Sequence, residues 1–237
     1  MGGLTYLDFL AKFGVGGAHP GGIGLTKNML LNENITEQSF VLDAGCGTGQ
    51  STAYLYQQYK ANVWGLEINP IMIEKAKDRF KNLKMPIQLT QGSVESMPFE
   101  DNTFDFVLSE SVLAFVNKPN AIQEFYRVLK PGGRVIANEM TINQPLNDLE
   151  ASEIKQFYAI DSLLLENDWK EMFEAAGFQN VQITGQIYDL KHSAPAQEFN
   201  FSRNFEPELF GILNQHGNML VKYHDVLSYR IISCSKN

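Results

Sequence analysis

Cysteine is scarce in this chain: only Cys46 and Cys234 occur among its 237 residues. Two cysteines so far apart provide neither a disulfide framework nor a pair at zinc-ligand spacing. Cys46 lies between two glycines, where a small side chain is needed, so we interpret it as a packing residue rather than a reactive thiol. The disulfide-rich and zinc-binding classes are therefore disfavoured.

Positive charge is also scarce, because 19 Lys and Arg stand against 27 Asp and Glu and leave a formal net charge of −8. This balance disfavours a nucleic-acid partner, since phosphate backbones attract basic surfaces. The mild basic cluster within 75–84 is predicted to be the solvated face of one helix.

Long hydrophobic runs are missing as well. No apolar run has the length that crosses a bilayer, and the first residues, MGGLTYLDFLAKFG, lack the basic start and apolar centre of a signal peptide. We therefore expect a cytoplasmic protein without a membrane span.

The most informative segment is Val41–Gln50, which reads VLDAGCGTGQ. A short apolar run ends in Asp43, three glycines alternate, and a helix-like stretch follows. Such a turn lets a ligand lie against the backbone beside the free N–H groups of a helix start. A dinucleotide fingerprint requires a third glycine at position 50, where this chain has Gln50. A nucleotide-dependent oxidoreductase is therefore a disfavoured alternative among the functions that this turn could serve.

Strand-like and helix-like periods alternate through the middle of the chain, which indicates an α/β fold with a mostly parallel sheet covered on both faces. A helix is predicted to begin at Pro70 after the capping residue Asn69, another near Pro119, and a third to end at Gly177. The predicted strands are 39–44, 61–68, 87–91, 104–109, 134–139, 181–187 and 227–235.

The acid-glycine turn resembles motif I of the class I S-adenosylmethionine-dependent methyltransferases, and EFYRVLKPGGRVIANE at 124–139 resembles the final core motif of that family. The resemblance implies a Rossmann-like, seven-stranded, mostly parallel sheet with an antiparallel last strand and a small helical lid. It implies one domain over 1–237, with a lid segment at 1–38, a cofactor-binding core at 39–140, and further sheet and lid insertions at 141–237. Within the family, the chain is closest in type to the small-molecule, ubiquinone/menaquinone-type branch.

Binding of S-adenosyl-L-methionine, whose product is S-adenosyl-L-homocysteine, then assigns roles to residues at strand ends. The glycine turn and Thr48 receive the methionine portion, and Glu67 stands where a carboxylate binds both ribose hydroxyls. Asp43 either organises the turn or receives the ammonium group through water. Ser93 replaces the usual adenine-binding Asp, so the adenine contact is expected to rest partly on the Val94 backbone. The complete predicted cofactor set is Asp43, Gly45, Cys46, Gly47, Thr48, Gly49, Glu67, Ile68, Ser93, Val94 and Ser109.

Three residues are candidates for catalysis. Glu110 and Glu139 end neighbouring strands and are expected either to face the transferred methyl group or to be exposed strand-end acids. His19 lies in the glycine-dense segment GVGGAHPGGIG, which either closes over the cofactor or is a loop without a catalytic role. No acids at metal-ligand spacing occur, so no metal is predicted.

The sequence thus predicts a methyltransferase that acts on a small molecule. The absence of an Asn/Asp-Pro-Pro-aromatic motif after 104–109 disfavours nucleic-acid acceptors. A non-catalytic protein that keeps the cofactor fold as an interaction or sensing module remains the alternative from another class. The sequence predicts neither the acceptor nor the oligomeric state.

Overall fold

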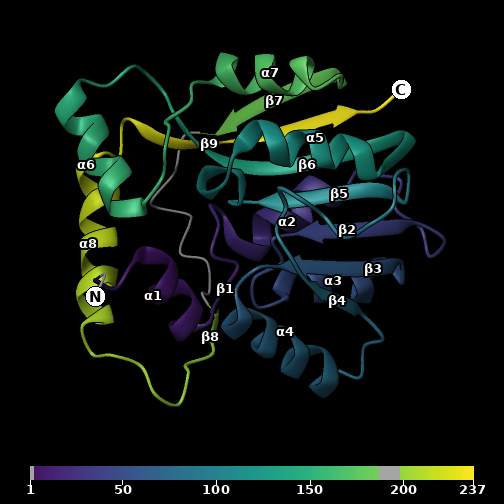
Figure 1. Ribbon diagram of the computed structural model, residues 1–237, viewed down its shortest axis with the longest axis horizontal. Coiled ribbons are helices and arrows are strands. Elements are labelled where there is room, and N and C mark those ends of the chain that lie inside the picture. Colours follow the sequence, from purple (N-terminus) through teal and green to yellow (C-terminus); the bar gives the residue numbers. More distant parts are fainter. Residues whose placement is uncertain (1–2, 187–197) are drawn as a thin grey trace.

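One mixed sheet organises the chain, of which the computed structural model describes residues 3–186 and 198–237. Its strand order is β4-β3-β2-β5-β6-β9-β7; the first five are mutually parallel, and β9 runs antiparallel to both of its neighbours. This topology confirms the predicted fold class (Figure 1). The strands are β2 (Phe40–Ala44), β3 (Asn62–Glu67), β4 (Gln88–Gln91), β5 (Phe104–Glu110), β6 (Leu129–Ile142), β7 (Gln179–Gln186) and β9 (Leu227–Ser235).

Both faces of the sheet are buried because apolar residues occur consecutively along the central strands. On β2, Leu42 joins one hydrophobic cluster and its neighbour Val41 joins another, as the alternation of side chains along a strand requires. The first cluster is closed by α5 (Lys118–Val128) and α7 (Glu166–Ala175), and the second by α2 (Gly22–Leu30) and α3 (Gln50–Tyr59).

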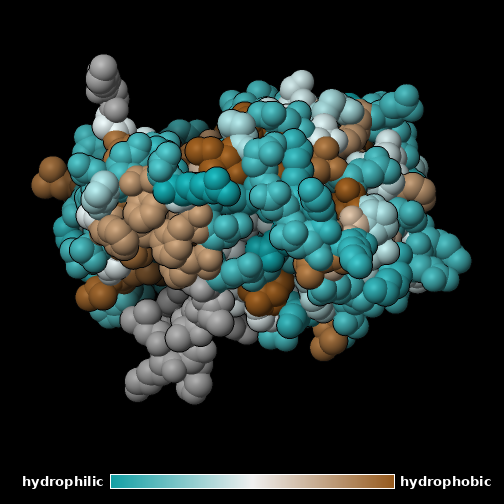
Figure 2. All heavy atoms as spheres, turned by 90° about the horizontal axis from the view of Figure 1, so that it is seen from below, coloured by the Kyte–Doolittle hydropathy of each residue, from teal (hydrophilic) through white to brown (hydrophobic). Residues whose placement is uncertain are grey.

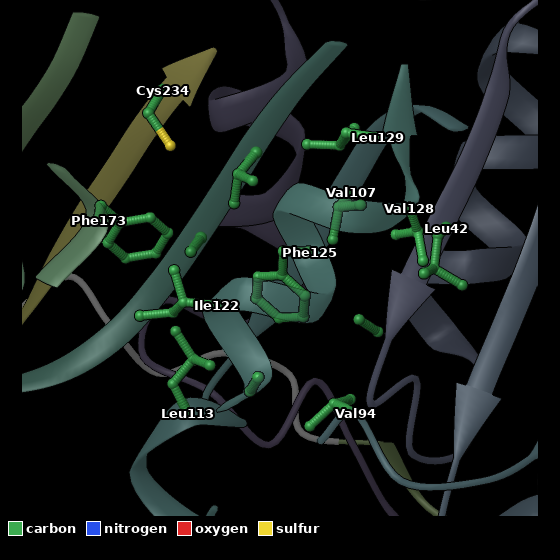
Figure 3. Close-up of a cluster of buried hydrophobic side chains, with 14 of the residues drawn as sticks. Leu42, Val94, Val107, Leu113, Ile122, Phe125, Val128, Leu129, Phe173 and Cys234 are labelled. Carbon is green, nitrogen blue, oxygen red and sulfur yellow. The ribbon is translucent and has the colours of Figure 1, made fainter. Parts of the chain in front are cut away.

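The larger core lies between α5, α7 and the sheet (Figure 3). Ile122 and Phe125 of α5 point toward the strands, and Phe173 of α7 lies beside Cys234 of β9. Burial raises the pKa of Cys234 to about 12 and the pKa of Cys46 well above its ordinary value. Both thiols therefore stay protonated at neutral pH and serve as apolar packing groups.

The predicted helix signals are confirmed. Asn69 caps α4 (Pro70–Asn82) by accepting from the N–H groups of Ile71 and Met72. Gly177 follows the end of α7 with φ +100°, a conformation that favours glycine.

The N-terminal region is more ordered than its glycine content indicates. It forms α1 (Tyr6–Phe13), the short strand β1 (Val15–Gly16) and α2. β1 pairs antiparallel with β8 (Glu198–Phe199) in a separate two-stranded sheet, which the sequence did not predict. Helix α8 (Leu209–Lys222) follows β8, whereas residues 187–197, with parts of the predicted strand 181–187 and of the predicted lid insertions, lie outside the described residues.

The region after β6 also differs in detail from the prediction. β6 continues to Ile142, beyond the predicted strand 134–139, and helix α6 (Asp148–Tyr158) follows it. The helices α1, α6 and α8 lie together at one side of the sheet (Figure 1). Rings of Phe13, Phe199, Phe201, Phe205 and Phe210 pack on one another there, and Figure 2 shows hydrophobic atoms gathered on the same side.

Two residues of the basic cluster, Lys75 and Arg79, depart from their predicted solvated positions. The side chain of Lys75 is buried and its ammonium group donates to the carbonyls of Asn200 and Lys12. Arg79 forms an ion pair with Glu198 of β8, at 2.9 Å between Nη2 and Oε2. The helix α4 therefore holds the segment around β8 against the sheet.

Candidate active site

A cavity of about 380 Å³ opens at the carboxyl ends of β2, β3 and β5. An open α/β sheet places its ligand crevice at this edge, because the loops after neighbouring parallel strands diverge there. Side chains from α1 and from the segment after β5 close the other side. Of the predicted cofactor set, the residues that line this cavity are Asp43, Gly45, Cys46, Gly47, Thr48, Glu67, Ile68, Ser93 and Val94.

The glycine turn between β2 and α3 is tied to the end of β3. The N–H groups of Gly45 and Cys46 both donate to the carbonyl of Leu66, at 2.7 and 2.9 Å. A Cβ on Gly45 would lie 2.4 Å from Val112, whereas a Cβ on Gly47 would meet no atom closer than 3.9 Å. Gly45 therefore permits close packing, and Gly47 leaves open space beside the cavity.

Glu67 connects the glycine turn to the residue that caps α4. Its two carboxylate oxygens accept from the N–H groups of Gly47, at 2.9 Å, and Asn69, at 2.8 Å. The side chain is buried, and burial raises its pKa above the ordinary value while the two backbone donors oppose that shift. The carboxylate is thus held rigidly at the cavity wall.

Asp43 and Thr48 supply further polar groups to the wall. Asp43 is fully buried and accepts from the hydroxyl of Thr52 at 2.6 Å; burial raises the pKa of Asp43 to about 7. The Thr48 hydroxyl is buried and has no hydrogen-bond partner among the described residues. A buried polar group that lines a cavity without a partner indicates a place for a ligand's polar atom.

The segment predicted to contact adenine, around Ser93 and Val94, lies at the same cavity. Ser93 and Val94 line the cavity, and the Ser93 hydroxyl accepts from the N–H of Glu95 at 3.1 Å. Because a hydroxyl oxygen can accept a second hydrogen bond, this contact leaves Ser93 able to meet a ligand donor.

The described lining of this cavity carries acidic side chains and no basic Lys or Arg side chain. Its described lining contains four acids, Asp43, Glu67, Glu95 and Glu110, and no Lys or Arg. Acidic walls favour a cationic ligand and disfavour a dinucleotide, whose two phosphates are usually met by positive or N–H-rich groups. The residues present therefore fit S-adenosylmethionine, which carries a sulfonium and an ammonium group.

Three predicted site residues do not reach the cavity: Gly49, Ser109 and Glu139. Gly49 faces α4, where a Cβ would lie 2.6 Å from Phe80. Glu139 is fully buried and one of its oxygens accepts from Ser109 Oγ at 3.3 Å and from the N–H groups of Val112 and Leu113, both at 3.1 Å. Its carboxylate holds the turn after β5 and does not line the cavity.

The reason for this placement is the register between β5 and β6. Glu110 is paired with Asn138, so these two side chains share one face of the sheet. Glu139 is one residue further along and therefore points to the opposite face, together with Ser109.

A second cavity, of about 150 Å³, adjoins the first and shares Leu10, Val15, Ala18, His19, Ser111 and Phe115 with it. The rings of Tyr6, Phe9, Phe115 and Tyr158 line it, and its described lining contains no Asp, Glu, Lys or Arg. The Tyr158 hydroxyl lies 2.9 Å from Nδ1 of His216, and burial lowers the pKa of His216 to about 4, so this histidine is neutral at pH 7.

Sequence reasoning missed these second-cavity residues. Tyr158 and His216 belong to α6 and α8, in segments that were expected to form the lid but that carry no motif. Only the packing of the two helices brings the residues together.

His19 and Glu110 meet where the two cavities join. The Nδ1 atom of His19 lies 3.4 Å from Oε1 of Glu110, and both side chains are nearly inaccessible, at 6% and 5% exposure. Glu110 also accepts from the hydroxyls of Thr26, at 2.8 Å, and Ser51, at 2.6 Å. The structure thus brings two of the three predicted catalytic residues together.

This fold, with an acid-glycine turn after β2 and a carboxylate at the end of β3, defines the class I S-adenosylmethionine-dependent methyltransferases. A family model described as "Methyltransferase domain" matches residues 42–137. The Bacillus subtilis (strain 168) protein named "Uncharacterized methyltransferase YodH" is 35% identical over 232 residues, which cover 98% of this chain and 99% of that protein. The chain belongs to this methyltransferase family and is an S-adenosylmethionine-dependent methyltransferase.

Solved structures agree with this fold. A phosphoethanolamine N-methyltransferase 2 from Haemonchus contortus superposes with a TM-score of 0.77 at 19% identity, over 97% of this chain and 57% of that one. A geranyl diphosphate C-methyltransferase from Streptomyces coelicolor A3(2) superposes with a TM-score of 0.74 at 14% identity, over 91% of this chain and 76% of that one.

Within 3–186 and 198–237, no helix combines the length and apolar character needed to cross a membrane. In the same residues, no group of three or more His, Cys, Asp and Glu is arranged to hold a metal ion.

The packing role of Gly49 can be separated from its backbone conformation. Gly49 has φ +77° and a Cβ there would clash with Phe80, whereas Gly132 has φ +80° and a Cβ there would meet nothing within 4 Å. We expect Gly132→Ala to lower the free energy of unfolding by about 1 kcal/mol and Gly49→Ala to lower it by a further ~1–3 kcal/mol. Urea denaturation measures both, and equal losses would contradict a packing role.

The burial of Glu139 predicts a pH-dependent stability. Burial raises the folded-state pKa of Glu139 to about 7 from an ordinary value of 4.5, so its stabilising contribution is complete below the lower value and is lost as the pH rises to 7. Glutamine does not titrate. We therefore expect the stability of Glu139→Gln relative to wild type to increase between pH 5 and pH 8 by on the order of 1–3 kcal/mol.

Urea denaturation at the two pH values measures this difference. The exposed acid Glu174 provides the matched control variant Glu174→Gln, for which the difference should not change with pH. A pH-independent difference for Glu139→Gln as well would show that Glu139 is not a buried titrating group.

Proposed function

We propose that the enzyme transfers the methyl group of S-adenosylmethionine to an uncharged, largely apolar small molecule that binds in the second cavity. One observation carries this proposal: an acidic cavity beside the glycine turn opens onto an aromatic cavity whose described lining has no charged carboxylate or ammonium group. Methyl transfer needs donor and acceptor in line and shielded from water, and two adjoining cavities under a lid provide that arrangement.

The cofactor residues receive proposed roles from their positions. Thr48 and the turn Gly45–Gly49 bind the methionine portion. Gly49 itself does not reach the cavity and lets the turn pack closely against Phe80 of α4. Glu67 binds the ribose hydroxyls, Ser93 and Val94 bind the adenine edge, and Asp43 meets the ammonium group through water. When bound, the cofactor supplies a methyl group on an electron-poor sulfonium.

The acceptor class follows from the second cavity. Phosphoethanolamine and geranyl diphosphate, which appear in the names of structural neighbours, carry phosphate, but neither cavity has a Lys or Arg in its described lining. Aromatic walls with a neutral Tyr158–His216 pair suit an apolar ring bearing a hydroxyl or carbonyl. This character supports a place in the ubiquinone/menaquinone-type branch, and the net charge of −8 supports a small molecule over a nucleic acid.

We also propose a single-domain organisation. The segment 1–38 and the part of 141–237 around α6, β8 and α8 form the lid over the core at 39–140, since residues from all three line the two cavities or pack beside them.

Replacement of Glu67 tests the cofactor site. We expect Glu67→Ala to weaken binding of S-adenosylhomocysteine about 10–100-fold, because the ribose loses charge-assisted hydrogen bonds. Isothermal titration calorimetry measures the affinity, and Glu74→Ala is the control because Glu74 is an exposed acid on α4. Binding of NAD(H) without binding of S-adenosylhomocysteine would refute the proposal.

The acceptor class is tested with a labelled methyl donor. We expect transfer of label to uncharged hydroxyaromatic probes such as hydroquinone and none to phosphoethanolamine. His216→Leu keeps the cavity apolar but removes the partner of Tyr158, so it should raise the KM for hydroquinone about tenfold and leave S-adenosylhomocysteine affinity unchanged. Transfer to phosphoethanolamine alone would contradict an uncharged acceptor.

A further inference from the structure

His19 occupies an unusual place for a loop histidine. Its ring belongs to the walls of both cavities, so it stands between the donor side and the acceptor side of the proposed site. The loop that carries it, between β1 and α2, is fixed from β6: the amide nitrogen of Asn138 donates to the carbonyl of Pro20 at 2.9 Å. This hydrogen bond to Pro20, the residue next to His19, restrains the position of the His19 ring.

The surroundings of Nδ1 determine which ring nitrogen carries the proton. Two acceptors lie near Nδ1, the Glu110 carboxylate at 3.4 Å and the Pro20 carbonyl at 3.3 Å. The Asn138 amide nitrogen, which donates to the Pro20 carbonyl, is 3.5 Å from Nδ1, further away than either acceptor. Acceptors around Nδ1 favour the tautomer with hydrogen on Nδ1, which leaves a lone pair on Nε2.

Nε2 has no hydrogen-bond partner among the described residues although it is buried. A buried imidazole nitrogen without a partner costs free energy unless a ligand uses it. The remaining titratable groups around the second cavity are Tyr6 of α1, Tyr158 of α6, and His216 and His224 in and after α8. None of them is a carboxylate or an ammonium group. On the side of the first cavity the acids are Asp43, Glu67, Glu95 and Glu110, of which Glu110 contacts His19.

We propose that His19 is the general base of the reaction and that Glu110 is its positioning residue, and this inference rests on the methyl transfer proposed above. An acceptor hydroxyl gives its proton to Nε2 while an oxygen lone pair forms the new C–O bond. The C–S bond of the donor breaks, and its electron pair stays on sulfur as a neutral thioether. The resulting imidazolium is stabilised by the Glu110 carboxylate, which Thr26 and Ser51 hold in place.

The presence of a base restricts the chemical class of the acceptor group. A neutral amine attacks with its own lone pair before it loses a proton, whereas a hydroxyl becomes a good nucleophile only as its proton leaves. The His19–Glu110 pair therefore indicates a hydroxyl acceptor, and transfer yields a methyl ether.

The first test reads the tautomer directly and needs no acceptor. Long-range ¹H–¹⁵N spectra of protein labelled on histidine nitrogen, in complex with S-adenosylhomocysteine, are assigned for His19 by comparison with His19→Gln. We expect hydrogen on Nδ1 and a bare Nε2 in the neutral ring. Hydrogen on Nε2 would overturn the proposal, because that nitrogen could not accept a proton.

The second test uses steady-state methyl transfer to hydroquinone between pH 5.5 and 9. We expect His19→Gln to lower kcat about 10²–10⁴-fold with little change in KM, and to remove the rise of rate with pH. Glu110→Gln should lower kcat less, about 10–100-fold, because the base remains but its charged partner is lost. Glu74→Gln, the same chemical change at an exposed position outside both cavities, is the control.

Calorimetry with S-adenosylhomocysteine separates this inference from the proposed function. If His19→Gln binds S-adenosylhomocysteine as wild type does and keeps the wild-type rate and pH profile, the base assignment is wrong and the methyltransferase assignment stands. If wild type does not bind S-adenosylhomocysteine, both fail.

Discussion

The hydrogen bonds between the end of β3 and the turn after β2 are the interaction on which the site depends. Leu66 receives two N–H groups from the turn, and Glu67 receives a third from Gly47. These contacts convert a glycine-rich, intrinsically flexible segment into a fixed wall, and they place a carboxylate on that wall. Because Glu67 also accepts from Asn69, the same side chain sets the start of α4, whose residues hold the segment around β8.

The two cavities that meet at His19 differ in the charge and polarity of their walls. The first cavity carries four acids and suits a cation, whereas the second carries rings and a neutral histidine. This contrast supports the proposed binding of a cationic donor in the first cavity and of an uncharged acceptor in the second. The helices α1, α6 and α8 contribute Tyr6, Tyr158 and His216, among others, to the wall of the second cavity.

Much of the fold was predictable because the core strands are buried on both faces and bounded by clear signals. Runs such as FVLDA and FDFVLS have few polar interruptions, and Asn69–Pro70 and Gly177 mark helix ends by local geometry alone. The β1–β8 pair was not predictable, because each strand has two residues and its partner is far away in the chain. No local pattern specifies such a pairing.

The sequence by itself determined the class of protein and predicted its donor site, because an acid, three alternating glycines and a carboxylate about 20 residues later indicate a cofactor turn at the ends of two neighbouring strands. It did not determine which acids face that site. Glu110 and Glu139 look equivalent as strand-end carboxylates, yet the β5–β6 register pairs Glu110 with Asn138 and turns Glu139 to the opposite face. A shift of one residue exchanges the two faces of a strand, so only the assembled sheet decided that Glu110 stands beside His19 while Glu139 supports the turn behind it.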